Sequence, residues 1–304
     1  MSDETLDVGM PRDLLLVRHG RSEGNEALEA AKRGDLSLMT EAFLARSAMN
    51  YRLVPEGAVQ AEQAGLFIRD WMETAGFATF DRCYVSPYLR AMETAARLDL
   101  PDAMWQRESL VRERDYGNWE GLDRPQTRER YPRSSELKQR NKFLWRPECG
   151  ESISDVELRV REMLATMARE LSGRRVVCVT HEDVMWTFRY RLEKLTIGEW
   201  LEFQEDEKHD IVNGGILHYT RERPDGSIDD RFHRVRRIDP TRPHEAAWTL
   251  IERPLLSSAE LLAEVDQTPP LSQRSGDPAD DAPGDVPDAA PGDASRRGDD
   301  GIGS

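Results

Sequence analysis

Three short apolar segments of the chain are each followed closely by side chains that could bind or attack phosphate. Arg18 and His19 follow the first segment, Arg90 the second and His181 the third. A guanidinium group matches phosphate oxygens, and backbone N–H groups at a helix start add affinity for anions. A histidine beside such groups can act as a nucleophile toward phosphorus. Brought together, these four residues predict a site for phosphoryl chemistry.

The three segments are predicted strands, because each is a short apolar run that opens onto a polar loop. They cover Asp13–Val17, Arg82–Ser86 and Arg175–Thr180. Two later strands, Ile211–Tyr219 and Ile228–Val235, are expected near the edge of the sheet. In α/β sheets, ligands bind beyond the carboxyl ends of the strands. We therefore expect the histidines and arginines to meet at that end.

Helices are predicted between the strands. One begins at Pro55 and runs for about twenty residues, and Pro87 occupies the first position of the next. The apolar face of the first helix is predicted to hold Val59, Ala64, Phe67, Ile68 and Trp71. A third helix covers Ser154–Leu171, with Ser154 as its N-cap and Glu157 completing a capping box. Alternating strands and helices predict an α/β fold with a largely parallel sheet.

Four blocks of sequence occur in an order typical of one family. They are LLLVRHGRSEGN at 14–25, SPYLRAMETA at 86–95, VRERDYGNWEG at 111–121 and VVCVTHEDVM at 176–185. Together they resemble the histidine phosphatase superfamily, which includes the phosphoglycerate mutases. The resemblance covers about residues 12–238. It implies a three-layer α/β/α sandwich of the phosphoglycerate mutase type.

The resemblance also implies a role for each matching residue. His19 would be the nucleophile that becomes phosphohistidine, and Glu113 the proton donor to the leaving oxygen. Arg18, Arg90 and His181 would be catalytic through their contacts with the phosphoryl group. The implied phosphate-binding residues are Arg18, Ser22, Asn25, Arg90 and His181. No metal or cofactor is expected, because positioned cations can stabilise the charge on the transferring group.

These residue types suit the implied chemistry. The imidazole of His19 must be neutral to attack, and a leaving alkoxide needs a proton from a carboxyl group. The same Glu113 can then act as the base for water that attacks the phosphohistidine. Without the family resemblance, Glu113 could equally be one half of a solvated Glu–Arg pair in the charged segment VRERDYG.

The residue after the second histidine departs from the family pattern. The family usually has glycine there, whereas this chain has Glu182 followed by Asp183. Acidic residues in the first turn of a helix favour its dipole, and this interpretation requires Glu182 to point away from the site. Alternatively, a carboxylate beside the phosphate pocket would repel substrate or raise the pKa of a neighbouring histidine.

Two segments are longer or more basic than expected. Residues 32–52 insert about one extra helix between Asn25 and Pro55, and either shape substrate access or decorate the surface. Segment 123–146 holds eight basic and three acidic residues, and is either an anion-binding cap or a solvated surface helix. If it binds anions, neutralising Arg128, Arg130 and Arg133 should raise the KM for polyanionic substrates.

Three functions are compatible with these motifs. We favour a phosphatase that hydrolyses phosphomonoesters, whose natural substrate the sequence leaves open. A phosphoglycerate mutase is the second alternative, since RERDYG resembles the mutases while NWEG resembles the phosphatases. The third is a phospholigand-binding or interaction protein that has lost turnover, for which Glu182 and the C-terminal tail are the best support.

Composition limits the partners that we expect. The 304 residues carry 57 acidic and 42 basic side chains, a formal charge of −15. That balance argues against a nucleic-acid-binding surface and against docking on an anionic membrane, but allows a small phosphorylated substrate. The N-terminus lacks an apolar secretory segment and three cysteines show no metal-binding spacing, so we expect a cytoplasmic protein. Its oligomeric state is left open.

The chain is expected to divide into four parts. Residues 1–11 form a flexible N-terminus, 12–238 the catalytic domain with its basic cap at 123–146, and 239–267 an extension that packs on the domain. Residues 268–304 hold six proline, six glycine and eight aspartate residues and no aromatic residue. Such a segment buries too little apolar surface to offset the entropy of ordering, and is predicted to be disordered.

Overall fold

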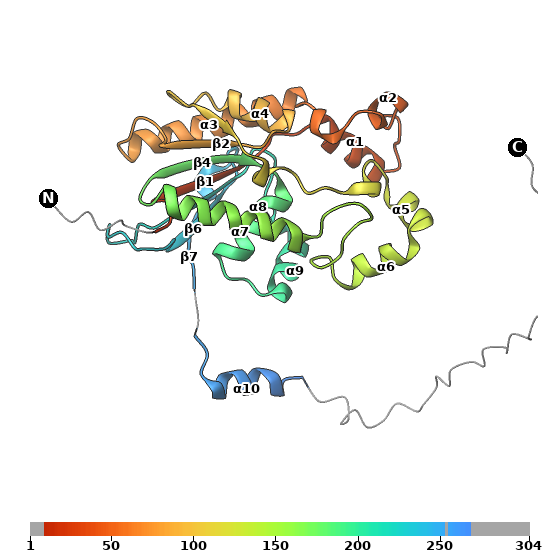
Figure 1. The fold of residues 1–304 in the computed structure, drawn as a ribbon. Helices are drawn as coiled ribbons and strands as arrows, with labels where there is room; N and C mark the ends of the chain where they lie inside the picture. Colours follow the sequence, from red (N-terminus) through yellow and green to blue (C-terminus); the bar gives the residue numbers. More distant parts are fainter. Residues whose placement is uncertain (1–8, 253–254, 269–304) are drawn as a thin grey trace, which may run out of the picture. The chain divides into compact units, whose positions relative to one another are not determined.

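The computed structural model describes residues 9–252 and 255–268. Its contacts divide the chain into two compact units, Met1–Arg253 and Pro254–Ser304, and the sheet lies in the first (Figure 1). Most of the predicted flexible N-terminus, and all but the first residue of the predicted disordered tail 268–304, lie outside the described residues. Both stay predictions.

A seven-stranded sheet forms the centre of the first unit, with the strand order β3-β2-β4-β1-β5-β6-β7. Strands β3, β2, β4 and β1 are parallel, whereas β5, β6 and β7 continue the sheet in antiparallel pairs. The strands are β1 Asp13–Arg18, β2 Arg82–Val85, β3 Trp105–Arg107, β4 Arg175–Thr180, β5 Ile216–Thr220, β6 Arg234–Ile238 and β7 Trp248–Leu250. The three strands that carry the predicted site residues are therefore adjacent.

Helices cover both faces of this sheet (Figure 1). Helices α3 and α4 pack on one face, and α7 and α8 on the other. The α-helices are α1 Glu23–Lys32, α2 Glu41–Leu44, α3 Pro55–Thr74, α4 Leu89–Arg97, α5 Arg124–Arg130, α6 Pro132–Arg140, α7 Ile153–Glu170, α8 Glu182–Leu192, α9 Ile197–Glu205 and α10 Ser258–Asp266. Single 3-10 turns are η1 Ala48–Asn50, η2 Ser109–Val111, η3 Gly117–Trp119, η4 Glu207–His209 and η5 Pro243–Glu245. The predicted three-layer α/β/α sandwich is confirmed.

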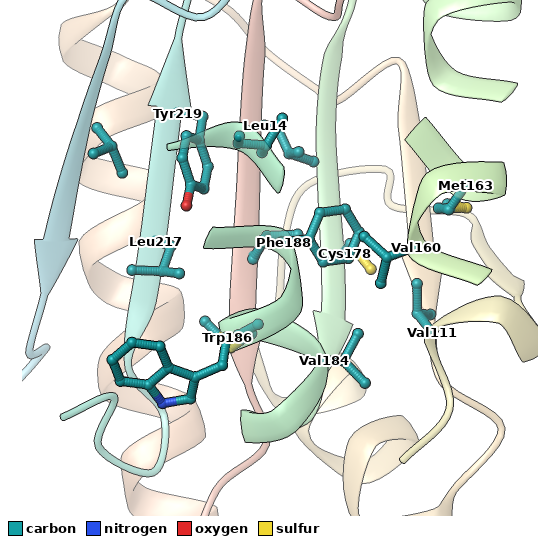
Figure 2. Close-up of a cluster of buried hydrophobic side chains, with 14 of the residues drawn as sticks. Leu14, Val111, Val160, Met163, Cys178, Val184, Trp186, Phe188, Leu217 and Tyr219 are labelled. Carbon is teal, nitrogen blue, oxygen red and sulfur yellow. The ribbon is translucent and has the colours of Figure 1, made fainter. Parts of the chain in front are cut away.

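The central strand β1 shows why helices cover both faces of the sheet. Its residues 14–17 are fully buried, and successive side chains point to opposite faces. Leu14 and Leu16 join the core beneath α7 and α8, where Figure 2 shows Leu14, whereas Leu15 and Val17 join the core beneath α3 and α4. A continuous apolar run is what a strand buried on both faces requires.

Two predicted helix starts are wrong by two residues. Helix α7 begins at Ile153, and its capping box joins Ser152 to Asp155 rather than Ser154 to Glu157. The earlier start is favoured because it keeps the fully buried Ile153 on the helix. Helix α4 begins at Leu89 rather than Pro87, because Tyr88 keeps an extended backbone.

The two late strands are also displaced from their predicted bounds. Strand β5 begins at Ile216 instead of Ile211, because Gly214 has φ 74° and turns the chain just before the strand. Strand β6 covers Arg234–Ile238 instead of 228–235. Helix α3 has the predicted bounds, but Val59 on its predicted apolar face is 51% exposed. Ala64 and Ile68 are buried as predicted, and Gly57, Ala61, Gly65 and Met72 are buried with them.

The C-terminal extension divides between the two units. Strand β7 pairs with β6 at the edge of the sheet. Helix α10 belongs to the second unit, so the predicted packing of the whole segment 239–267 on the domain stays a prediction. Cys83 and Cys178 are buried free cysteines, and Cys149 is an exposed one. Within the described ranges, no helix is both long and apolar enough to span a bilayer.

Candidate active site

His19 directly follows β1 and is 2% exposed. Its backbone N–H donates to Thr180 on the adjacent β4, so the loop leaves the sheet in a fixed direction. The ring nitrogen Nδ1 lies 2.8 Å from the carbonyl oxygen of Gly20, which can only accept a hydrogen bond. Nδ1 therefore carries the proton, and the lone pair of the neutral ring lies on Nε2.

The glycine after His19 is required by a close approach of two backbones. A Cβ atom on Gly20 would lie 2.1 Å from the carbonyl oxygen of Gly57 at the start of α3. Thr94 of α4 accepts the backbone N–H of Gly20 at 3.0 Å. The loop that orients the His19 ring is thus held between α3 and α4, and any larger residue at position 20 would displace it.

Arg90 joins three parts of the site. Its Nε donates to Nε2 of His19 at 3.1 Å, its Nη1 to the carbonyl of Ala48 at 2.7 Å, and its Nη2 lies 3.4 Å from Glu113. The guanidinium also lies 4.8 Å from the centre of the Tyr88 ring. Burial, together with the positive charge of Arg90, lowers the pKa of His19 well below its usual value. His19 is therefore neutral at pH 7.

His181 directly follows β4 and is fully buried. Its ring packs edge-on against that of His19, with the centres 5.0 Å apart. Nε2 lies 2.7 Å from the hydroxyl of Ser86, and Nδ1 lies 3.3 Å from Glu113 without the geometry of a hydrogen bond. Burial lowers the pKa of His181 to about 4 despite the nearby Glu113 carboxylate. The carboxylate favours the tautomer with the proton on Nδ1.

Glu113 lies in the loop between η2 and η3, against both histidines and Arg90. Its Oε1 accepts the backbone N–H of Arg114 at 3.0 Å. Burial alone would raise the pKa of Glu113, but the attraction of His181 and Arg90 outweighs it and the net shift is downward. Arg159 of α7 donates to the carbonyl groups of Arg112 and Glu113 in this loop and to one in η2, and thereby fixes the loop.

Arg18 does not contact His19, although its charge contributes to the lowered pKa of that ring. Its Nη2 pairs with Glu182 at 2.6 Å, and its Nη1 donates to the carbonyl of Ile211. Glu182 therefore turns toward the predicted phosphate pocket, and the interpretation that it points away is wrong. Burial raises the pKa of Glu182, while Arg18 opposes the shift. Asp183 turns elsewhere, to Tyr116 and Arg114.

Ser22 and Asn25 are engaged with each other in the free protein. They form the capping box of α1, in which the Ser22 hydroxyl donates to Asn25 at 3.0 Å. The side chain of Asn213 donates to the carbonyl of His19 at 3.1 Å and lies 3.4 Å from the oxygen of Asn25. These two predicted phosphate ligands thus lie beside the His19 loop without contacting its ring.

The insertion at 32–52 contributes to the site. It forms α2 and the turn η1, whose Ala48 carbonyl accepts from Arg90. The rings of Phe43 and Tyr51 stack with their centres 4.5 Å apart, and Tyr51 is buried against Gly24. The inserted segment therefore holds Arg90 in place and does more than decorate the surface.

Three donors in the site have a spacing that could hold a metal ion. Ligand atoms of His19, Glu113 and His181 lie within 4.8 Å of one another. The fixed positive charge of Arg90 on two of them opposes a cation there. The expectation that no metal takes part stays a prediction.

The sequence did not identify four contributors to the site. Ser86 follows β2 directly but is predicted as the last residue of the strand, and Asn213 lies in a segment predicted to be strand. Thr94 and the carbonyl of Ala48 give no local signal, because their roles depend on contacts distant in sequence. Ser86 could have been found, since it occupies the same strand-end position as His19 and His181.

Comparison with known proteins identifies the family. The sequence profile of the histidine phosphatase superfamily (branch 1) matches residues 14–225. The chain belongs to this superfamily, whose members act as phosphatases or phosphoglycerate mutases. A 2,3-bisphosphoglycerate-dependent phosphoglycerate mutase from Rhizobium etli is 28% identical over 196 residues, which cover 62% of this chain and 83% of the mutase.

Two solved structures share the fold. A putative alpha-ribazole-5'-P phosphatase from Escherichia coli is 16% identical, with a TM-score of 0.56 over 81% of this chain and 98% of its own. A mycobacterial glucosyl-3-phosphoglycerate phosphatase, solved with VO3, is 21% identical, with a TM-score of 0.54 over 81% of this chain and its full length. At these identities the likeness shows the fold.

Proposed function

We propose that this protein hydrolyses phosphomonoesters through a covalent phosphohistidine on His19. The observation that carries the proposal is the orientation of the His19 ring. Nδ1–H is bound to Gly20, and the Nε2 lone pair faces Arg90 in a buried pocket that also holds His181 and Glu113. This arrangement supplies a neutral nucleophile next to fixed positive charge.

In the first step, Nε2 of His19 attacks phosphorus as the bond to the leaving oxygen breaks. Arg90 exchanges its contact with Nε2 for the phosphoryl oxygens, and Nδ1–H of His181 donates to another of them. These donors stabilise the charge that is spread over the three oxygens. Glu113 passes a proton to the leaving oxygen, so the products are an alcohol and phosphohistidine.

In the second step, water attacks phosphorus and the phosphorus–nitrogen bond breaks. Glu113, now a carboxylate, takes the proton of the water, and the lone pair returns to His19. The products are inorganic phosphate and the neutral starting histidine. Two steps through one intermediate thus use the same carboxyl group first as acid and then as base.

Glu113 is ionised in the free protein, so substrate binding must raise its pKa before it can donate a proton. In the free protein the pKa of Glu113 is lowered by its neighbours, chiefly His181 and Arg90. A bound phosphate dianion adds negative charge beside the carboxylate and takes over hydrogen bonds of Arg90. Both effects raise the pKa of Glu113. We therefore infer that Glu113 becomes a general acid only when the pocket is occupied.

Arg18, Ser22 and Asn25 are proposed to complete the phosphate pocket. Their support is their position: Arg18 is the last residue of β1 and directly precedes His19, and Ser22 and Asn25 lie at the start of α1. The N-terminal end of the α1 dipole favours an anion, although Asn25 N–H already donates to Ser22 and Glu23 N–H to Arg52. Binding requires Arg18 to share or leave its contact with Glu182.

Phosphoglycerate mutase activity is the second candidate, because the 28% identical relative from Rhizobium etli carries that name. A mutase would return the phosphoryl group from His19 to another hydroxyl of the substrate. Incubation with 3-phosphoglycerate and a bisphosphoglycerate primer separates the two. If isomer forms faster than phosphate is released, the protein is a mutase and the proposed phosphatase function is wrong.

The test of the proposal is phosphate release from a panel of phosphomonoesters by purified protein, with and without a chelator. Release should be unaffected by the chelator and absent in His19→Ala. No release from any substrate by protein that still binds phosphate would support the third candidate, a phospholigand-binding protein. Loss of release on chelation would overturn the metal-free mechanism.

A further inference from the structure

A second basic pocket lies in the cap segment, apart from the residues around His19. Its volume is about 510 Å³, and it lies between helices α5 and α6 of the cap and helix α9. Its charged lining residues are Arg124, Arg128, Lys138, Arg140, Lys142 and Glu205. Five positive charges and one negative charge line this cavity in a chain whose formal charge is −15.

The cations of this pocket lack carboxylate partners. Within the described part of the chain, Arg124, Arg128, Lys138 and Arg140 form no ion pair, and Lys142 donates to the neutral amide of Gln204. Several arginines outside the pocket do have carboxylate partners. Arg112, Arg114 and Arg159, for example, are all paired with Glu151 or Asp183. The pocket therefore concentrates positive charge that the protein itself does not neutralise.

Lys138 is held in a defined position in this cavity. Its ammonium nitrogen lies 4.7 Å from the ring centre of Trp145 and 5.2 Å from that of Trp119. Burial, with repulsion from Lys142, lowers the pKa of Lys138 to about 8. A fixed, partly desolvated cation of this kind gains more from an incoming anion than a mobile surface lysine does.

The pocket lies at the same end of the molecule as the candidate active site. Helices α5 and α6 lie beyond the carboxyl ends of the parallel strands, as α1 does (Figure 1). Trp119, which lines the pocket, belongs to the turn that follows the Glu113 loop. Lys142 acts on the pKa of Glu182, which in turn pairs with Arg18.

We propose that this cap pocket binds a second anionic group, a carboxylate or a further phosphate, of the substrate whose phosphoryl group reacts at His19. The inference rests on the proposed function and narrows it to small polyanionic phosphate esters. It also revises the sequence-based choice of residues. Of Arg128, Arg130 and Arg133, only Arg128 lines this cavity, whereas Lys138 and Lys142 do so at its partly buried side.

The kinetic test compares a bisphosphorylated sugar with p-nitrophenyl phosphate, which has no second anionic group. Lys138→Met removes the charge but keeps an unbranched apolar side chain beside the two tryptophans. We expect the ratio of kcat/KM for the two substrates to fall about tenfold or more, through the KM of the sugar. Arg130→Met, in the same segment but outside the pocket, should leave the ratio unchanged. An unchanged ratio in Lys138→Met, or an equal fall in both variants, overturns the proposal.

A binding measurement separates this proposal from the function on which it rests. Inorganic tripolyphosphate is titrated calorimetrically into His19→Ala protein with and without Lys138→Met, after melting curves show both to be folded. If Lys138→Met weakens tripolyphosphate binding, the pocket is supported even if the wild type hydrolyses nothing. In that case only the proposed hydrolysis is rejected. Hydrolysis without such binding removes the pocket alone. Tripolyphosphate binding with an unchanged kinetic ratio identifies a site for a free anion and contradicts the substrate assignment.

Discussion

In the proposed mechanism, one hydrogen bond and one positive charge prepare His19 for attack on phosphorus. The Gly20 carbonyl fixes the proton on Nδ1, and burial beside Arg90 keeps the ring neutral. Position 20 must be glycine because its backbone lies against that of Gly57, and Arg90 is anchored by the carbonyl of Ala48. At the scale of the residue, the proposed catalysis therefore depends on the atoms that hold His19 and Arg90 as much as on those two residues.

Replacement of Glu113 tests the assignment of the general acid. In Glu113→Gln the turnover of alkyl phosphates should fall by about 10²- to 10⁴-fold, because a poor leaving group needs the proton. Aryl phosphates with good leaving groups should lose much less. Steady-state rates on one ester of each kind measure the difference. Equal losses on both would remove Glu113 from this role.

Replacement of Glu182 tests the meaning of its pairing with Arg18. Glu182→Gln removes a negative charge beside the pocket and frees the Arg18 guanidinium for phosphate. We expect the KM for phosphomonoesters to fall several-fold, an effect of roughly 1 kcal/mol. Glu170→Gln, which removes the same charge from an exposed position of α7, is the control. A KM that rises or stays constant would show that the pair supports Arg18 rather than competing for it.

Sequence reasoning located the residues that directly follow buried strands. His19 and His181 were found in this way, because a long apolar run fixes both the strand and its end. The orientation of Glu182 could not be found, since helix-dipole considerations apply equally to both directions of its side chain. Asn213 was missed because a glycine turn, and not a strand, precedes Ile216.

At the scale of elements, the inserted segment is the least expected part of the site. Its turn η1 presents a carbonyl to Arg90, and α2 supports that turn through the stacked rings of Phe43 and Tyr51. The sequence predicted an extra helix there but not its contact with Arg90. Strands β3 and β7 were not predicted either, because three residues give too short a pattern.

Removal of the stacked ring tests the contribution of this segment. In Phe43→Ala, Tyr51 loses its partner and η1 becomes less ordered, so Arg90 is less well placed. We expect kcat/KM for phosphomonoesters to fall several-fold with little change in the melting temperature, because α2 has no buried residue. Leu36→Ala, at an exposed position of the same insertion, should have neither effect. A large loss of stability with unchanged kcat/KM would assign the segment a purely structural role.

At the scale of the whole molecule, charge is distributed so that a strongly acidic protein can hold an anion. Residues 268–304 contribute −5 of the formal −15. Fixed cations gather instead around His19 and in the cap pocket. A small cationic pocket can dominate the field at its own entrance, whatever the total charge.

Stability should depend on pH through the buried histidines. The pKa of His181 is about 4 in the folded protein, below its usual value of 6.5, so the unfolded chain binds a proton first as the pH falls. The contribution of neutral His181 to the free energy of unfolding is therefore complete above pH 6.5 and is lost progressively as the pH falls to about 4. Between pH 7 and 5 this amounts to about 2 kcal/mol.

Denaturant unfolding in phosphate-free buffer at the two pH values measures this loss. His181→Gln removes the titrating group, so the variant should lose less stability on acidification than the wild type by about that amount. Identical losses in the two proteins would show that His181 is not held neutral by burial.

The covalent intermediate is the most direct test of the central claim. Purified protein is mixed with a radiolabelled phosphomonoester, quenched in base, and analysed for phosphate bound to protein. We predict stoichiometric labelling that is stable in base, lost in acid, located on His19 and absent in His19→Ala. Rapid phosphate release with no labelled protein under any quench, or equal labelling of His19→Ala, would contradict the account.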